Sequence, residues 1–536
     1  MSPRVVTFAA VVAAACGSPS SPTSPTSPTS ATAASLAGNP AAEPPRLVVL
    51  LVLDQWPEWA FDVKRAHLHA GGFDRLLSDG DWHVGEHPSA ATLTAPGHTL
   101  LGTGEPPATS GILANEWWDR GTARMVHAAE GSDGAPSAIW LRVPGMADAV
   151  AASGRGGKAV SVSLKDRASI LPLGHAGTPI WYEPKQAAWV SLAPVPWLDA
   201  WNRDHPVSAR LHDVWTPLDA KALPALSGRA DDAPGELGEK QFGPTFPHDP
   251  QTTKDPADAI FAMPLGNELV LDTATHAIDA EQLGADAVPD LLVVSLSAHD
   301  YVGHGWGHES WEMWDLEMRL DARLATFLGA LDAKVGAGKW AMIVTSDHGA
   351  APLPDPRRGG HITFQEVAAS VQRVAVAELG PGQWVSAAKY PTVWLSPQAL
   401  AVPVKDRDIA IRKMIYALRS FPGLEHVDRT DALAGDCDKR RGDARAICLA
   451  LDPERSGEIA FFPAAGWVME ETDEPLATAH GSLHAYDRRV PLIVLPPGRT
   501  RHAPLAASDG VVVQMTEIAP LLAGWLGVTP PNKLPR

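Results

Sequence analysis

The chain alternates continuous apolar runs with stretches in which apolar residues recur at helical spacing. The apolar runs predict strands, and residues 46–53 are apolar enough throughout to indicate a strand buried on both faces. Further strands are predicted at residues 157–164, 290–297, 340–345 and 490–495. Helices are predicted at residues 267–283, 311–331 and 516–526. Strands that alternate with helices indicate an α/β fold with a mostly parallel central sheet.

Two ranges fall outside this regular alternation, in a chain whose 536 residues are enough for one large domain with insertions. Residues 171–262 are rich in Pro, Trp, Asp and Gly and have weak periodicity, so we interpret them as a cap or insertion on the substrate side. Residues 364–465 alternate short strands and helices and form a predicted second insertion. Both ranges lie within a main domain that we expect to span residues 46–536.

The N-terminus has the features of an export signal. Arg4 precedes the apolar run Val5–Ala15, and small residues lead into Cys16. This pattern predicts a bacterial lipoprotein signal over residues 1–16, with Cys16 as the lipidated residue, although position 13 is Ala where such signals usually have Leu. Residues 17–45 are rich in Ser, Pro and Thr and predict an extended tether. The alternative is simple secretion with a disordered leader; either way, we expect an exported protein of the periplasm or cell envelope.

Composition narrows the class of partner. Hydrophobic residues make up 45% of the chain and charged residues 20%, as in soluble globular proteins. The 62 acidic and 44 basic residues give a formal net charge of −18, which argues against non-specific binding to nucleic acid. Apart from Cys16, the chain contains only Cys437 and Cys448. Because no His lies near these two residues, we expect a structural disulfide rather than a metal site.

Side chains of the kind that bind metals follow three predicted strands. Asp54, Asp300 and the pair Asp347–His348 come directly after apolar runs, where ligands gather in parallel sheets. His304 lies one turn beyond Asp300 if that segment is helical, and His480 follows a polar loop. Carboxylate and imidazole ligands suit Zn²⁺, and their number is sufficient for two sites in one pocket. Taken singly, each residue could instead be an ordinary turn or capping residue.

Residues 89–104 contain the candidate nucleophiles, which are the hydroxyl groups of Ser89, Thr92, Thr94 and Thr99. Pro96 suits a first helical turn, and a helix N-terminus favours an anion such as phosphate. The alternative interpretation is a Thr that caps a helix. A hydroxyl needs a base or a metal to become a nucleophile, so the predicted metal ligands favour the catalytic interpretation.

Two cations, Lys165 and Arg167, end the strand predicted at residues 157–164. In an extended segment, side chains two residues apart share a face, so both could contact one dianion. The alternative is a pair of solvated surface charges.

Taken together, these motifs resemble the alkaline phosphatase superfamily, in its type I phosphodiesterase/nucleotide pyrophosphatase-like branch. The chain is most similar to the phosphate-irrepressible alkaline phosphatases, which are monoesterases with a Thr nucleophile. The resemblance runs from about Arg46 to Pro530. It is carried by the motifs Val-Leu-Asp54-Gln, Thr94-Ala-Pro-Gly-His-Thr, Asn115-Glu-Trp, Ser-Leu-Lys165-Asp-Arg167-Ala-Ser, Asp300-Tyr-Val-Gly-His304, Ser-Asp347-His348-Gly and His480-Gly-Ser.

The resemblance implies a three-layer α/β/α sandwich with two zinc sites. One zinc would be held by Asp300, His304 and His480. The ligands of the other would be Asp54, Asp347, His348 and the oxygen of Thr94. Thr94 would be the nucleophile that becomes phosphorylated, and Asn115, Lys165 and Arg167 would contact the phosphoryl oxygens.

These roles lead us to expect a monomeric, zinc-dependent phosphomonoesterase that acts on a broad range of phosphate monoesters and releases inorganic phosphate. The alternative is a phosphodiesterase or nucleotide pyrophosphatase that uses the same two metals. A third hypothesis, a catalytically silent binding protein of the envelope, is disfavoured by the intact set of ligands.

Overall fold

The computed structural model describes residue 36 and residues 43–472, 474–498 and 511–535. The predicted signal over residues 1–16, with Cys16, and nearly all of the predicted tether therefore lie outside the described residues. Among those that are described, no helix is both long and apolar enough to cross a membrane.

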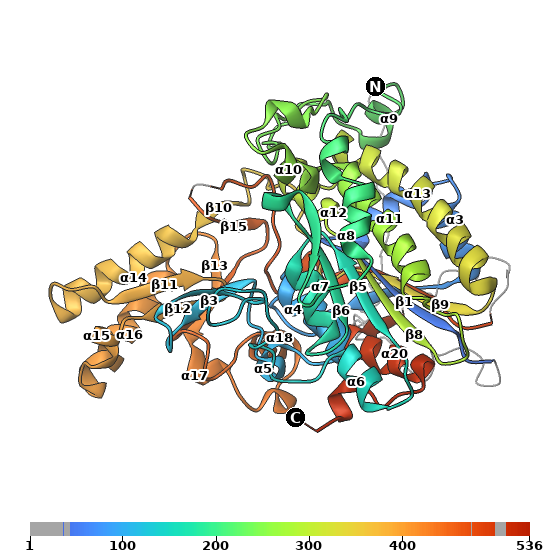
Figure 1. Ribbon diagram of the computed structural model, residues 1–536. Coiled ribbons are helices and arrows are strands. Elements are labelled where there is room, and N and C mark those ends of the chain that lie inside the picture. The colour runs from blue at the N-terminus through green and yellow to red at the C-terminus, as the bar shows by residue number, and fades with distance from the viewer. Residues whose placement is uncertain (1–35, 37–42, 473, 499–510, 536) are drawn as a thin grey trace, which may run out of the picture.

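A nine-stranded sheet forms the centre of the molecule (Figure 1). The strand order is β17-β2-β16-β9-β1-β8-β5-β6-β7, and the neighbours from β9 to β6 run parallel. Strand β16 is antiparallel to both of its neighbours, and β7 is antiparallel to β6. The strands are β1 (Leu47–Leu53), β2 (Asp81–Glu86), β5 (Ala159–Ser163), β6 (Thr178–Glu183), β7 (Ala188–Ser191), β8 (Asp290–Leu296), β9 (Trp340–Thr345), β16 (Arg489–Leu495) and β17 (Val512–Gln514).

Helices cover both faces of this sheet, which confirms the predicted three-layer α/β/α fold. Alternate residues of β1 belong to two separate cores, because successive side chains of a strand point to opposite faces. One core includes residues of α2 (Glu58–Lys64), α3 (Gly72–Asp79), α11 (Pro264–Ala280), α12 (Ala298–Trp306) and α13 (Trp311–Leu331). The other includes residues of α4 (Thr94–Thr103), α6 (Met146–Ala152), α7 (Asp166–Leu173) and α20 (Ile518–Leu526). The continuous apolar character of residues 47–53 follows from this burial on both faces, whereas Arg46 precedes the strand and is exposed.

The range 171–262 differs from the predicted insertion at its start. Strands β6 and β7 fall inside this range, yet they extend the central sheet beyond β5. Pro179, Trp181 and Trp189 lie within these two strands, and this composition obscured the strand pattern in the sequence. The remainder of the range contains the short helices α8 (Leu198–Asp204), α9 (Leu223–Ser227) and α10 (Pro256–Ala259).

A second sheet with its own core lies beside the central one, at the left of Figure 1. Its strand order is β11-β12-β14-β13, and helices α14 and α16 pack against it. The elements of this lobe are α14 (Phe364–Leu379), β11 (Val385–Lys389), β12 (Thr392–Leu395), α15 (Pro397–Leu400), α16 (Val404–Arg419), β13 (Leu424–Arg429), α17 (Thr430–Leu433), α18 (Gly442–Leu449) and β14 (Ile459–Pro463). The predicted disulfide between Cys437 and Cys448 is present.

Two small two-stranded sheets and short helices complete the described part of the fold. Strands β3 (Glu116–Asp119) and β4 (Arg124–His127) form a hairpin after α5 (Pro107–Ser110). Strands β10 (Gly360–Thr363) and β15 (Trp467–Glu470) pair in parallel, and α19 (Ala485–Arg488) precedes β16.

Candidate metal centre

Four neighbouring strands bring the predicted site residues to one edge of the central sheet. Asp347 follows β9, Asp54 follows β1, Asp300 lies just beyond β8 and Lys165 just beyond β5. Since these four strands are adjacent and parallel, their carboxyl ends meet. All four side chains are buried, with at most 6% of any side chain exposed.

Three histidines complete the cluster, and a backbone carbonyl fixes the ring of each one. The Nδ1 atoms lie 2.9 Å from the Thr478 carbonyl for His304, 2.8 Å from the Thr92 carbonyl for His480 and 3.0 Å from the Gly349 carbonyl for His348. Because a carbonyl only accepts, each Nδ1 carries the proton and donates, which leaves the Nε2 lone pair available to a metal.

The Nε2 atoms converge on the carboxylates in two overlapping groups. Potential ligand atoms of Asp300, His304 and His480 lie within 4.8 Å of one another, and so do those of Asp54, Asp300 and His348. Asp347 lies beside the second group, since its Oδ2 is 3.4 Å from the Nε2 of His348. These groupings follow the two predicted ligand sets, except that Asp300 lies between them.

The donor atoms of the cluster fit a divalent metal. Asp54 Oδ1 and His348 Nε2 are buried without a hydrogen-bond partner, although buried polar atoms are normally satisfied. Oxygen and imidazole donors in this arrangement suit zinc and related first-row metals.

The electrostatics of the cluster point the same way. Burial and the neighbouring Asp347 raise the pKa of Asp54 well above its ordinary value. Burial also acts to raise the pKa of Asp300, but Lys165 and His304 outweigh it and hold that pKa well below the ordinary range. Lys165 Nζ lies 2.6 Å from both Asp54 Oδ2 and Asp300 Oδ2. One ammonium group thus pairs with two carboxylates, Asp54 and Asp300, so a further cation would be stabilised in the cluster.

Thr94 is the first residue of α4, and its side chain is buried. The prediction that backbone N–H groups of this turn face an anion is wrong for the three residues that follow Thr94. The Ala95 N–H donates to Asn115 Oδ1 at 2.8 Å, Pro96 has no N–H, and the Gly97 N–H donates to the Leu93 carbonyl at 2.9 Å. Donors for an anion beside Thr94 therefore come mainly from side chains.

Asn115 and Arg167 line one cavity of about 380 Å³, together with Glu116, His127 and Asp166. The bond from Ala95 engages Asn115 Oδ1, so the amide NH₂ is the group left to donate. Arg167 Nε is buried without a hydrogen-bond partner. Two polar groups at this cavity thus have the capacity to donate to a bound oxygen anion.

Lys165 and Arg167 do not share a face in the way an extended segment would allow. Lys165 is the N-cap of α7, and Arg167 already belongs to the first turn of that helix. The predicted extended geometry is wrong because the chain turns at Asp166. Lys165 points between Asp54 and Asp300, whereas Arg167 lines the cavity.

The other hydroxyls of residues 89–104 have structural roles in the fold. Thr92 Oγ1 accepts from the Ser482 N–H and donates to the Ser482 carbonyl, both at 3.0 Å, so it fixes the loop that carries His480. Ser89 Oγ accepts from the Ala91 N–H. Thr99 is buried inside α4.

Sequence reasoning missed one residue that contacts the cluster, Gln55, and left His98 only as a further histidine candidate. His98 Nδ1 lies 3.1 Å from Asp347 Oδ2, and the side chain of Gln55 reaches Asp300. Gln55 directly follows a predicted ligand, but glutamine is not a usual metal ligand, so nothing in the residue type singled it out.

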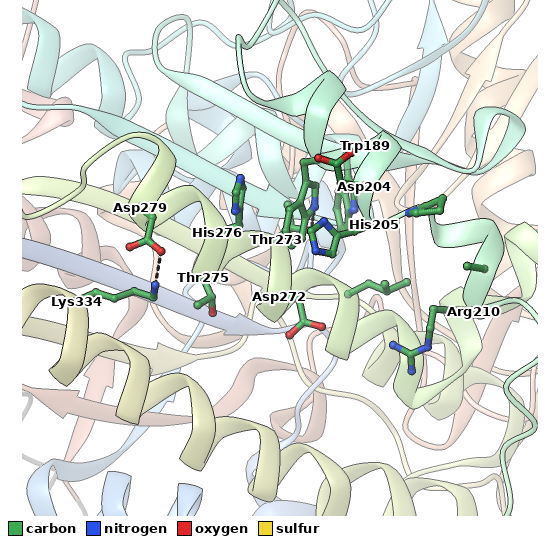
Figure 2. A pocket seen from close by; sticks show the side chains of 14 residues that line it. Trp189, Asp204, His205, Arg210, Asp272, Thr273, Thr275, His276, Asp279 and Lys334 are labelled. Atoms are coloured by element: carbon green, nitrogen blue, oxygen red, sulfur yellow. Dashed lines mark hydrogen bonds and ion pairs between the residues drawn. The ribbon is translucent and has the colours of Figure 1, made fainter.

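A larger cavity of about 570 Å³ lies away from these residues, between α8 and α11 (Figure 2). Trp201 is stacked between His205 and His276 there, and Lys334 pairs with Asp279. None of the predicted site residues lines it, so its size does not make it the catalytic site.

Comparisons with known proteins agree with this geometry. Residues 48–487 match the family model "Type I phosphodiesterase / nucleotide pyrophosphatase", and the chain belongs to this family. A protein of Myroides odoratus named calcium-transporting ATPase is 29% identical, over 91% of this chain and 93% of that protein. Alkaline phosphatase PafA of Elizabethkingia meningoseptica is 28% identical, over 91% and 92%. The crystal structure of wild-type PafA superposes with a TM-score of 0.81 at 26% identity, over 92% of this chain and 98% of that one.

Proposed function

We propose that this protein is a phosphomonoesterase that uses two zinc ions and a Thr94 nucleophile to release inorganic phosphate from a broad range of monoesters. The observation that carries the proposal is the convergence of three fixed imidazoles and three carboxylates at one sheet edge. The similarity to alkaline phosphatase PafA over most of both chains supports the same activity.

Each residue has a role that its surroundings support. Asp300, His304 and His480 would hold one zinc, and Asp54, Asp347 and His348 the other, which would also be bound by the Thr94 oxygen. Zinc at these positions lowers the pKa of a bound hydroxyl group and stabilises negative charge on oxygen. In the proposed reaction, the Thr94 oxygen would attack phosphorus while the P–O bond to the alcohol breaks, and the alcohol would leave with the proton that Thr94 loses. Water would then attack the phosphothreonine, which returns the Thr94 hydroxyl group and releases inorganic phosphate.

Side chains beside Thr94 favour a monoester over a diester. The dianion of a monoester has oxygens free to accept from the Asn115 amide, Lys165 and Arg167. A diester carries a second carbon substituent, against which these polar groups would be buried without partners. Lys165 would contact both the metal ligands and the substrate, because its ammonium group already contacts Asp54 and Asp300.

The competing function is a phosphodiesterase or nucleotide pyrophosphatase, which the description of the matching family favours. The decisive experiment compares hydrolysis of an aryl phosphate with that of an aryl methyl phosphodiester, with and without a chelator. We expect a clear preference for the monoester and loss of both activities on chelation. A preference for the diester would contradict the monoesterase assignment.

The Arg167→Ala variant refines this comparison. It should lower kcat/KM for the monoester by about 10- to 100-fold, since a charge-assisted hydrogen bond contributes about 1.5–3 kcal/mol. The diester, which has fewer charged oxygens, should lose less. Equal losses for both substrates would argue against a role in discrimination.

We further propose that the protein is an exported monomer of the periplasm or cell envelope, anchored through a lipid on Cys16. The residues before Cys16 and the Ser/Pro/Thr-rich stretch after it support this. If so, Cys16→Ser should move the protein from the membrane fraction to the soluble fraction. Equal distribution of both forms would indicate secretion without an anchor.

A further inference from the structure

Gln55 has an unusual backbone conformation directly beside the candidate metal centre. Its backbone φ is +60°, a value that residues other than glycine rarely adopt, and the Gln55 side chain is fully buried. Such a conformation costs about 1–3 kcal/mol and persists only when its surroundings hold it in place. Here the Gln55 N–H donates to Asp347 Oδ1 at 3.2 Å, and the Gln55 carbonyl accepts from His299 Nδ1 at 3.1 Å.

The Gln55 side chain reaches the ligands through a gap that a glycine leaves in α12. A Cβ atom on Gly303 would lie 2.1 Å from Gln55 Oε1, so no larger residue fits there without displacing the amide. His308 Nε2 lies 2.9 Å from Oε1 and donates to it. The orientation of the amide follows from the Asp300 carboxylate, which only accepts, so the amide NH₂ group faces Asp300 and Oε1 faces His308. The other end, Nε2, therefore donates to Asp300 Oδ1 at 2.7 Å and lies 3.1 Å from His304 Nε2.

We infer that Gln55 is a positioning residue for the metal centre. His308 holds its amide, and the absence of a side chain at Gly303 leaves room for that amide. It fixes the Asp300 carboxylate through its side chain and contacts Asp347 through its backbone, so it links the two ligand groups. The inference rests on the metal centre proposed above. Groups that orient metal ligands typically contribute 10- to 100-fold to metal affinity.

The Gln55→Met variant tests the amide, because methionine keeps the length of the side chain but cannot donate to Asp300. The full-length protein is stripped of metal and titrated with Zn²⁺ in competition with a chromophoric chelator. We expect the affinity for one zinc ion to fall by about 10- to 100-fold, and added zinc to restore the hydrolytic rate. Gln372→Met is the matched control, since Gln372 also bonds through its amide but lies in the second lobe, where it contacts the Trp384 and Val385 N–H groups.

A second pair of variants tests the gap itself. Gly303→Ala should displace the Gln55 amide and weaken zinc binding to a similar degree. Gly329→Ala is its control, because Gly329 also lies in a helix but a Cβ atom there meets nothing within 4 Å. If Gln55→Met fails to fold, this pair decides the question alone.

Two results would overturn the inference. One is unchanged zinc affinity in Gln55→Met, or in Gly303→Ala if the former does not fold. The other is an equal loss of affinity in the Gln372→Met or Gly329→Ala control, which would indicate general destabilisation. The zinc titration needs no substrate, so it remains informative even if neither ester is hydrolysed and the proposed function fails.

Discussion

Thr94, the proposed nucleophile, illustrates how a catalytic assignment depends on the neighbours of a residue rather than on its own chemistry. Four hydroxyls compete in residues 89–104, and the structure places the other three in capping, loop-fixing or helix-interior positions. The carboxylates and imidazoles at the sheet edge lie across four strands and a distant loop, and only the fold brings them together.

Replacing Thr94 should remove the proposed nucleophile without disturbing the fold. Thr94→Ala is expected to lower kcat for an aryl phosphate by at least about 10³-fold, whereas Thr94→Ser keeps a hydroxyl group and most of the rate. Thr99→Ala is a suitable control in the same helix, because the Thr99 hydroxyl is buried without a partner. Initial rates measure the effect, and turnover retained in full by Thr94→Ala would exclude the assigned nucleophile.

At the scale of elements, the sequence predicted well what depends on local periodicity. The apolar spacing at residues 311–331 and the run at residues 340–345 match α13 and β9 residue for residue. The ligand candidates could be named in advance because strand ends are visible in sequence. The partners of Lys165, the bonded N–H groups of α4 and the role of Gln55 could not, since they depend on contacts between distant segments.

A buried pair between the cap and α13 should make stability depend on pH. His248 Nε2 lies 3.0 Å from Glu312 Oε1. Burial raises the pKa of Glu312 to about 9 and lowers that of His248 to about 4. Between about pH 6.5 and 9 the folded state keeps a Glu312 proton that the unfolded chain releases, so stability falls as pH rises, by up to about 1.4 kcal/mol per pH unit. Between about pH 4.5 and 6.5, His248 acts in the opposite direction and offsets this loss.

Urea unfolding at pH 6.5, 7.5 and 8.5 measures this slope. Glu312→Gln should reduce it by up to about 1.4 kcal/mol per pH unit, because the amide does not titrate. Glu454→Gln, at a side chain that is 80% exposed, should leave the slope unchanged. A slope that is the same in all three proteins would show that Glu312 is ionised when folded.

The disulfide should stabilise the second lobe without serving catalysis. It joins Cys437 to Cys448 over a separation of 11 residues, a loop for which cross-linking contributes about 3 kcal/mol by restricting the unfolded chain. Reduction should therefore lower the unfolding temperature, while hydrolysis at 25 °C continues, because neither cysteine is among the residues of the metal centre. Parallel thermal scans and rate assays with and without reductant check this; immediate loss of activity on reduction would contradict it.

At the scale of the whole molecule, the metal centre joins segments spread across most of the chain. Asp54 and His480 lie near opposite ends of the family match, and the central sheet and the loops above it meet at their carboxyl edge. Metal binding should accordingly stabilise the fold as a whole. Free zinc at 1,000 times its dissociation constant stabilises a folded protein by about 4 kcal/mol.

Chelation is therefore expected to lower the unfolding temperature, and added Zn²⁺ to restore it. The measurement is a thermal scan of the metal-free and zinc-loaded protein, with Mg²⁺ as the control, because Mg²⁺ prefers all-oxygen sites. Identical unfolding temperatures with and without zinc would contradict a metal centre built from these residues.

The first turn of α4 has a consequence for how such an enzyme could change over evolutionary time. Because the Ala95 and Gly97 N–H groups are already engaged and Pro96 has none, recognition of the phosphoryl group in the proposed reaction would depend mainly on the side chains of Asn115, Lys165 and Arg167. Side chains can be exchanged by single substitutions, whereas a backbone anion site cannot. Selectivity for monoesters or diesters could therefore change while the metal ligands and the fold stay the same. Relatives with the same fold could differ in substrate through a few amino-acid substitutions.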